Sequence, residues 1–193
     1  MGSQIDYIGS LVVNGLVILL VLTLNGNVAT TSFQRTRDLT SQQSATTMME
    51  ILEYDLYKAG YRTTGVPFLQ AESTAIRFTA DIDDNGVADT VSYLLGTPSE
   101  NGLTPNLRDR PLRRRVNSTL PYDIAQGLVE FSFAYFDTGG HRMLYDSLKT
   151  ETQRALVRHL EVSFRVEPSD PMDTTYIPVQ VRKIIRPRNV GGW

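Results

Sequence analysis

An uncharged apolar run near the N-terminus constrains this chain more than any other feature. It covers residues 8–24, seventeen residues that read IGSLVVNGLVILLVLTL. A helix needs about 20 apolar residues, and at least about 17, to cross a bilayer. The core helix of a soluble protein is the alternative, but such a helix seldom lies at a chain terminus. The run therefore predicts a membrane-inserted helix.

The charges that flank this run leave its orientation open. The preceding residues, MGSQIDY, contain no Lys or Arg, and the first charges after the run are Arg35, Arg37 and Asp38. Because positive charges mark the cytoplasmic side, this asymmetry alone would place the rest of the chain in the cytoplasm. The alternative is that a basic leader precedes the sequence, and the remainder of the chain favours that alternative.

One helix is expected to continue far beyond the apolar run. Asn25-Gly26-Asn27 could end or loosen it, yet residues 28–59 contain no Pro or Gly. Apolar residues at spacings of three and four form one face of this segment: Ala45, Met49, Leu52, Leu56 and Ala59. Gly60 follows as a C-terminal cap. We predict a helix over residues 5–59, and divide the chain into an apolar helix (1–27), an amphipathic stem (28–60) and a globular domain (61–193).

The globular domain is predicted to consist of β-strands, because its apolar residues recur at every second position. Two strands flank Asn85-Gly86, the dipeptide most typical of a two-residue hairpin loop. A loop at that dipeptide would form three apolar cross-strand pairs on one face, which the stem would cover: Ile76–Leu95, Phe78–Tyr93 and Ala80–Val91.

Three further strands are predicted after a polar segment at residues 96–123, which we expect to be a long loop with one short strand. The same alternation marks residues 129–135, 160–166 and 177–185. No helical pattern separates these strands, so the sheet should be mainly antiparallel. The predicted fold class is α+β, with the long N-terminal helix packed on an antiparallel sheet.

Composition excludes several classes of function. A net charge of −2 argues against a primary nucleic-acid partner, since nucleic-acid binders are usually strongly basic. The chain has no cysteine, which excludes disulfides, thiolate catalysis and cysteine-ligated metal sites. Its two histidines, His141 and His159, lie in no recognisable catalytic motif. We therefore predict a protein that is not an enzyme.

The chain resembles the type IV pilin superfamily, with a closer similarity to minor pilins and J-type pseudopilins. Three passages carry the resemblance in addition to the apolar helix. They are the stem end MMEILEYDLYKAGYR (residues 48–62), the hairpin IRFTADIDDNGVADTVSYLL (76–95), and the later strand GLVEFSFAYFDTGG (127–140) with the terminal RPRN (186–189).

The resemblance implies a structural subunit of a pilus-like filament or pseudopilus, which polymerises through its apolar helix with itself or with other pilin-like subunits. It implies an assembly machinery, residence in the inner membrane before assembly, and then an extracellular or periplasmic filament. Asp6 would pair with the N-terminal amine of a neighbouring subunit, or would simply be solvated at the headgroup level. Gly9 and Gly15 would let helices approach closely, and Asn14 could bond between helices. The alternative function is a membrane-tethered monomer whose sheet domain binds a ligand.

The hairpin also contains a candidate calcium site, although no cofactor is required by anything else in the sequence. Asp81, Asp83, Asn85 and Asp89 stand at the first, third, fifth and ninth positions of a calcium-loop pattern, with glycine at the sixth. Ser92 replaces the bidentate Glu of the twelfth position. An ordinary acidic hairpin explains the same residues, so both interpretations stand.

Two other features have both a functional and a structural interpretation. Five arginines between Arg108 and Arg115 could bind an acidic polymer, but no aromatic residues are interleaved to stack on bases. A solvated loop or a subunit contact is therefore favoured.

Asn117-Ser118-Thr119 matches a glycosylation sequon, a short pattern that often arises by chance.

Overall fold

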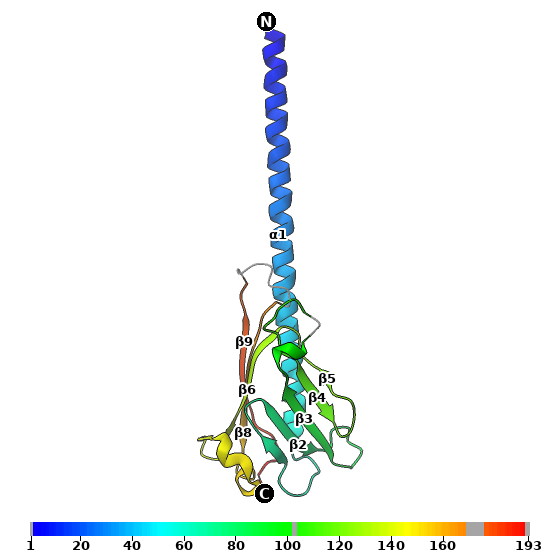
Figure 1. Ribbon diagram of the computed structural model, residues 1–193, viewed down its shortest axis with the longest axis vertical. Coiled ribbons are helices and arrows are strands. Elements are labelled where there is room, and N and C mark those ends of the chain that lie inside the picture. Colours follow the sequence, from blue (N-terminus) through cyan, green and yellow to red (C-terminus); the bar gives the residue numbers. More distant parts are fainter. Residues whose placement is uncertain (1, 102–103, 169–175, 192–193) are drawn as a thin grey trace. The chain divides into compact units, whose positions relative to one another are not determined.

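The computed structural model describes residues 2–101, 104–168 and 176–191, with the backbone alone for residues 2–6. The chain divides into two compact units, Met1–Leu39 and Thr40–Trp193. The predicted α+β fold is confirmed: one long N-terminal helix precedes antiparallel β-sheets, against which its C-terminal part packs (Figure 1).

Helix α1 (Gly2–Lys58) is continuous, so Asn25-Gly26-Asn27 neither ends nor interrupts it. Its end depends on Gly60, which has φ +82° and donates its N–H to the Thr79 carbonyl at 2.8 Å. A Cβ added at Gly60 would lie 2.7 Å from the Asn189 carbonyl oxygen. The left-handed backbone and the close approach of the C-terminal segment therefore both require glycine at this cap.

One face of α1 enters the core from Ser41 onward. The five apolar residues predicted for that face are all buried: Ala45, Met49, Leu52, Leu56 and Ala59. Met48 and Asp55 are buried on the same stretch. The unit boundary at Leu39/Thr40 lies just before this face begins, and the 27/28 boundary expected from composition leaves no mark on the helix.

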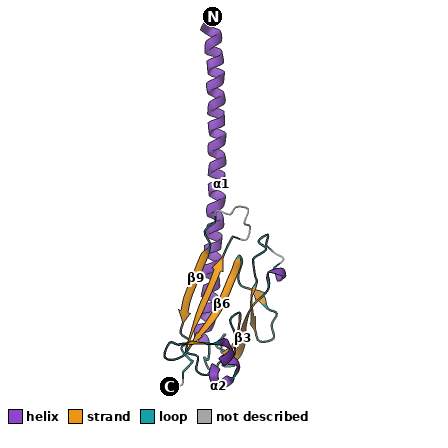
Figure 2. Cartoon of the chain, turned by 60° about the vertical axis from the view of Figure 1, so that its left-hand side comes forward, coloured by secondary structure: helices purple, strands orange, loops and turns teal. Residues whose placement is uncertain are grey.

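Within the described residues, the strands form two antiparallel sheets in place of the single sheet expected (Figures 1 and 2). The first has the order β1-β2-β3-β4-β5: Phe68–Ala71, Ala75–Ala80, Asp89–Leu95, Leu112–Val116 and Tyr122–Asp123. The second has the order β7-β6-β8-β9: Arg142–Met143, Leu128–Phe136, His159–Val166 and Val179–Ile185. Three short helices lie between strands of the same sheet: η1 (Pro98–Glu100) between β3 and β4, and η2 (Tyr145–Lys149) with α2 (Glu151–Arg154) between β7 and β8.

A single hydrophobic core joins the two sheets to the C-terminal part of α1. Met48 and Leu52 from the helix belong to the same buried cluster as Phe78 and Tyr93 of the first sheet and Phe133 of the second. Backbone bonds also connect the sheets, since the Phe133 N–H donates to the Ser73 carbonyl at 2.8 Å. Strand β8 buries every second residue, as its alternation predicts.

The predicted hairpin register is wrong by two residues. The structure pairs Ile76 with Tyr93, Phe78 with Val91 and Ala80 with Asp89. The loop is longer than Asn85-Gly86, because the aspartate side chains from residue 81 onward bond to loop backbone in place of a two-residue turn. A shift of two residues keeps each side chain on its predicted face, so Phe78 and Tyr93 remain in the core.

A buried ion pair anchors α1 to the first sheet. Asp55 is 1% exposed and accepts two bonds from Arg114 of β4, from Nε at 2.6 Å and from Nη2 at 3.0 Å. Tyr93 of β3 donates its hydroxyl to the same carboxylate. Burial lowers the pKa of Arg114, but its bonds to Asp55 outweigh that effect and raise it. In the sequence, the sign of this contact is the presence of a charged residue, Asp55, on the otherwise apolar face of the helix.

Replacing Asp55 with Asn should lower the free energy of unfolding by about 3 kcal/mol, because Arg114 would then lack its counterion in a largely buried position. The matched control is Glu53→Gln, which removes the partially exposed Glu53–Lys183 pair and should cost less than about 1 kcal/mol. Urea unfolding of the full chain in detergent micelles measures both. Equal losses in the two variants would contradict a special role for the Asp55 pair.

Candidate functional site: apolar helix segment and acidic hairpin loop

The N-terminal segment of α1 exposes apolar side chains around its whole circumference. Each large apolar side chain in residues 7–24 is between 48% and 68% exposed. The described residues 7–39 include none that is buried. By length and composition this helix could cross a membrane, with a mean hydropathy of 2.3 over its most apolar window. The predicted membrane association therefore agrees with a segment whose side chains are exposed in the described structure.

The residues expected to mediate helix assembly occupy this segment. Gly9 and Gly15 have open space around them, since an added Cβ would meet no atom within 4 Å. Asn14 lies between them on the exposed helix surface. The Asp6 side chain lies outside the described residues. The two glycines therefore leave gaps in the side-chain surface of a helix segment that consists mainly of Val, Leu and Ile.

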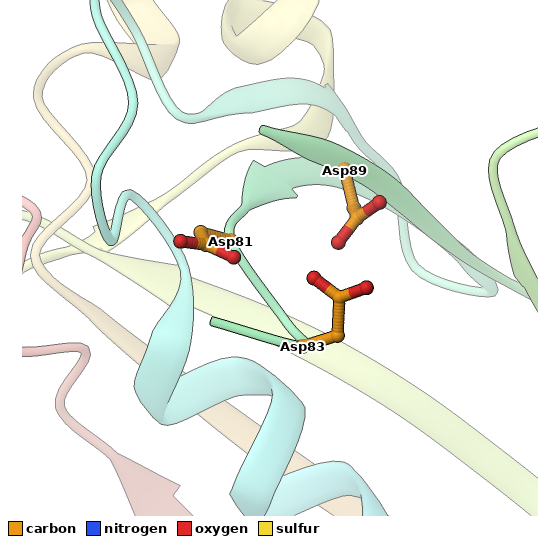
Figure 3. Close-up of side chains that lie close together, drawn as sticks. All are labelled: Asp81, Asp83 and Asp89. Carbon is orange, nitrogen blue, oxygen red and sulfur yellow. The ribbon is translucent and has the colours of Figure 1, made fainter. Parts of the chain in front are cut away.

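The acidic loop between β2 and β3 brings together three of the four predicted metal ligands. Asp81, Asp83 and Asp89 turn their carboxyl groups toward a common space (Figure 3), where one oxygen of each lies within 4.8 Å of the others. Asp81 and Asp89 are buried at the ends of the loop, whereas Asp83 is exposed. The fourth, Asn85, directs its side chain to the loop itself: Oδ1 accepts from Val87 N–H at 2.7 Å.

Asp81 holds the loop in its conformation. Its Oδ2 accepts the Gly86 N–H at 3.0 Å and Arg62 Nη1 at 3.2 Å. Burial would raise the pKa of Asp81, but these bonds outweigh burial and hold that pKa below its ordinary value. Gly86 has φ +87°, so the glycine at the sixth position supplies the left-handed backbone that this turn needs. Asp81 is consequently ionised at neutral pH.

Two neighbouring segments also contact this loop. Lys58, at the end of α1, donates to the Ile82 carbonyl at 2.8 Å and to Asp84 at 2.9 Å. Asn117, in the β4–β5 connection, donates Nδ2 to Asp89 at 2.6 Å and accepts the Thr90 N–H at 2.8 Å. The sequence interpretation missed both, because the contacts join residues 24 to 28 positions apart.

The Asn117 contacts give its sequon a structural explanation. The nitrogen that would carry a glycan is the one that donates to Asp89. Asn117 also has φ +53°, a left-handed conformation that asparagine tolerates better than most residues. The contacts that Asn117 makes with the acidic loop therefore explain why asparagine stands at this position.

The five arginines between Arg108 and Arg115 all have partners within the chain. Arg108 pairs with Glu167, Arg113 with Glu100 and Asp123, and Arg114 with Asp55, whereas Arg110 and Arg115 donate to the Gly96 and Asn117 carbonyls. Glu167 is itself buried and also pairs with Arg165 at 2.9 Å. These contacts favour an intramolecular role for the cluster over an acidic-polymer site.

A groove of about 710 Å³ with a mixed polar and apolar lining lies beside the helix in the second unit. Hydroxyl and amide groups of α1 line one side, from Thr40, Gln43, Ser44 and Thr47. The opposite side comes from the segments around β4 and β5 and includes Thr104 and Arg110. Such a groove could hold a ligand. A ligand-binding groove is the feature that the alternative function, a membrane-tethered ligand-binding monomer, requires.

A scan against protein-family models finds none that matches this chain, and a search of curated proteins finds no match either.

Replacing Asn117 with Ala should lower the free energy of unfolding by about 1–2 kcal/mol, because two hydrogen bonds are lost and alanine is disfavoured at positive φ. The exposed neighbour Ser118 provides the control, and Ser118→Ala should change stability by less than about 0.5 kcal/mol. Urea unfolding of both full-length variants measures the difference. Two variants of equal stability would mean that Asn117 does not support the acidic loop.

Proposed function

We propose that this chain is a structural subunit of a type IV pilus-like filament or pseudopilus, and that it polymerises through the apolar segment of α1. One observation carries the proposal: the apolar side chains of that segment are exposed all around the helix, although the second unit has a core of its own. Thirteen large apolar side chains in residues 7–24 are exposed. Leaving them in water would cost on the order of 20 kcal/mol.

This cost determines which surroundings the apolar segment can have. The unfolded chain exposes the same side chains, so folding of the second unit does nothing to remove this cost. The segment must be covered by lipid, by protein, or by each in turn. A filament subunit satisfies both conditions: lipid covers the helix in the inner membrane, and copies of the same helix cover it in the extracellular or periplasmic polymer.

The surface of the segment is suited to contact between helices. In a lipid-like environment helices associate through close packing at small residues and through polar side chains, because apolar burial no longer drives them together. Gly9 and Gly15 offer such approaches, and Asn14 offers an amide at the same depth. The partners are accordingly other copies of this chain or related subunits, with Asp6 close to the end of the contact.

The second candidate function is a membrane-tethered monomer that binds a ligand, and the groove beside residues 40–47 favours it. The two functions differ in whether the apolar segment ever leaves the lipid. They therefore predict different outcomes for changes in that segment that leave the second unit intact.

Deletion of residues 1–27 should yield a soluble, folded monomer that cannot polymerise. Every buried residue of the core cluster lies at Ala45 or beyond, so the truncated chain keeps its core. Circular dichroism and sedimentation report folding and mass, and electron microscopy reports filaments. If the truncated protein still polymerises, the apolar helix is only an anchor, and assembly through that helix is contradicted. A failure to fold would mean that the core depends on the deleted segment.

Replacement of Gly15 by Leu should reduce filament formation at least about tenfold, because a bulky residue would block close helix approach. The free space at Gly15 means that the isolated subunit can accept the side chain, so the second unit should stay folded. Val17→Leu, which enlarges a residue that is already bulky, is the control. Filament mass sheared from cells that carry the assembly machinery measures both variants, and equal yields would contradict assembly through this surface.

A further inference from the structure

The buried carboxyl group of Asp81 has an oxygen that no group in the described chain satisfies. The residue is fully buried, and its Oδ1 has no hydrogen-bond partner. The opposite oxygen takes both donors, the Gly86 N–H and Arg62. A buried carboxylate oxygen without a donor is costly, and a bound cation is one of the usual ways in which proteins satisfy it.

The charges around this carboxylate are unbalanced. Asp81, Asp83, Asp84 and Asp89 supply four negative charges to the loop, whereas the cations that contact them are Lys58 and Arg62. Lys58 engages Asp84, and Arg62 engages Asp81, so neither cation pairs with Asp83 or Asp89. Two negative charges therefore remain in a space where the carboxylate oxygens lie within 4.8 Å of one another.

We propose that this loop is a divalent-cation site, selective for Ca²⁺ over Mg²⁺, with Asp81, Asp83 and Asp89 as its carboxylate ligands. Two oxygens on opposite sides of a calcium ion lie about 5 Å apart, which accommodates the observed separation. Calcium also tolerates irregular sets of oxygens, whereas Mg²⁺ demands near-octahedral geometry and loses water reluctantly. The inference is independent of filament formation.

The ligands can reach the ion with little rearrangement. Both oxygens of Asp83 accept bonds only from Asn85 within the described structure, and these bonds are exposed, so water or the ion can replace them. Asp89 accepts Ile82 N–H and Asn117 Nδ2 but keeps lone pairs for a metal. Asn85 and the carbonyl group of the seventh position, Val87, could complete the ligands as in other calcium loops.

The missing bidentate ligand sets the affinity. The twelfth position is Ser92, which lies in β3 opposite Arg77 and cannot supply a carboxylate. Sites with few charges and a flexible loop bind calcium at about 10⁻⁴–10⁻³ M, the range of extracellular modules. At such concentrations the ion would hold the loop against Lys58 of α1 and against Asn117, the two contacts that connect it to the rest of the unit.

Thermal unfolding of the full chain in detergent micelles tests the proposal, with 10 mM CaCl₂, 10 mM MgCl₂ or EGTA at matched ionic strength. Calcium should raise the Tm by roughly 3–5 °C over EGTA, and magnesium should raise it by less. Asp83→Asn should reduce the calcium shift to within about 1 °C. Because Asp83 also accepts bonds from Asn85 within the loop, the calcium shift of each variant is measured against the Tm of the same variant in EGTA. Asp146→Asn, an exposed aspartate elsewhere, should keep the full shift.

Terbium luminescence provides a second measurement that does not depend on stability. The Tyr54 hydroxyl lies 3.5 Å from the Ile82 carbonyl oxygen, close enough to sensitise an ion bound in the loop. Terbium emission on tyrosine excitation should appear in the wild type and in Asp146→Asn, decline when calcium is added, and be absent in Asp83→Asn. No calcium shift in the wild type, or equal shifts and equal emission in Asp83→Asn, would overturn the proposal.

Discussion

Side chains from Met48 to Ala59 on α1 contact the apolar faces of both β-sheets, so the two sheets share one core. This shared helix is the constraint on which the rest of the fold depends. The buried Asp55–Arg114 ion pair holds the first sheet to it, whereas the second sheet contacts it mainly through the shared core, with a partially exposed Lys183–Glu53 pair at 2.6 Å. A change in the rotation of the helix would expose its apolar face and separate Asp55 from Arg114.

The same helix carries two different surfaces along one continuous backbone. An α-helix satisfies its own backbone hydrogen bonds, so it can pass from an apolar environment into a protein core without interruption. From Ser41 onward one face of the helix is buried by the rest of its unit, whereas residues 7–24 are exposed in the described structure. The proposed filament function follows from this difference, because subunits that share the exposed segment can cover it for one another.

The acidic loop combines a structural turn with the cation site that we propose. Asp81 and Asp83 bond to loop backbone and determine how the chain turns between β2 and β3. The same turn brings three carboxylates together and leaves Asp81 Oδ1 without a donor. An ordinary hairpin needs the first property alone. The second property is what distinguishes a cation site from a turn rich in aspartate.

Residue patterns alone were sufficient for the α+β fold, the long helix, the buried face from Ala45 to Ala59 and the alternation of β8, because each of these depends on local periodicity. They also indicated which aspartates gather in the hairpin. The register of that hairpin, the division into two sheets, and the partners of Asp55, Asp81 and Asn117 were decided only by the tertiary structure. Period-two alternation is unchanged by a two-residue shift, so the pattern could not distinguish the two registers. Side chains far apart in sequence, such as Asp55 and Arg114, meet only when the helix has packed against the sheet, and no local pattern encodes that distance.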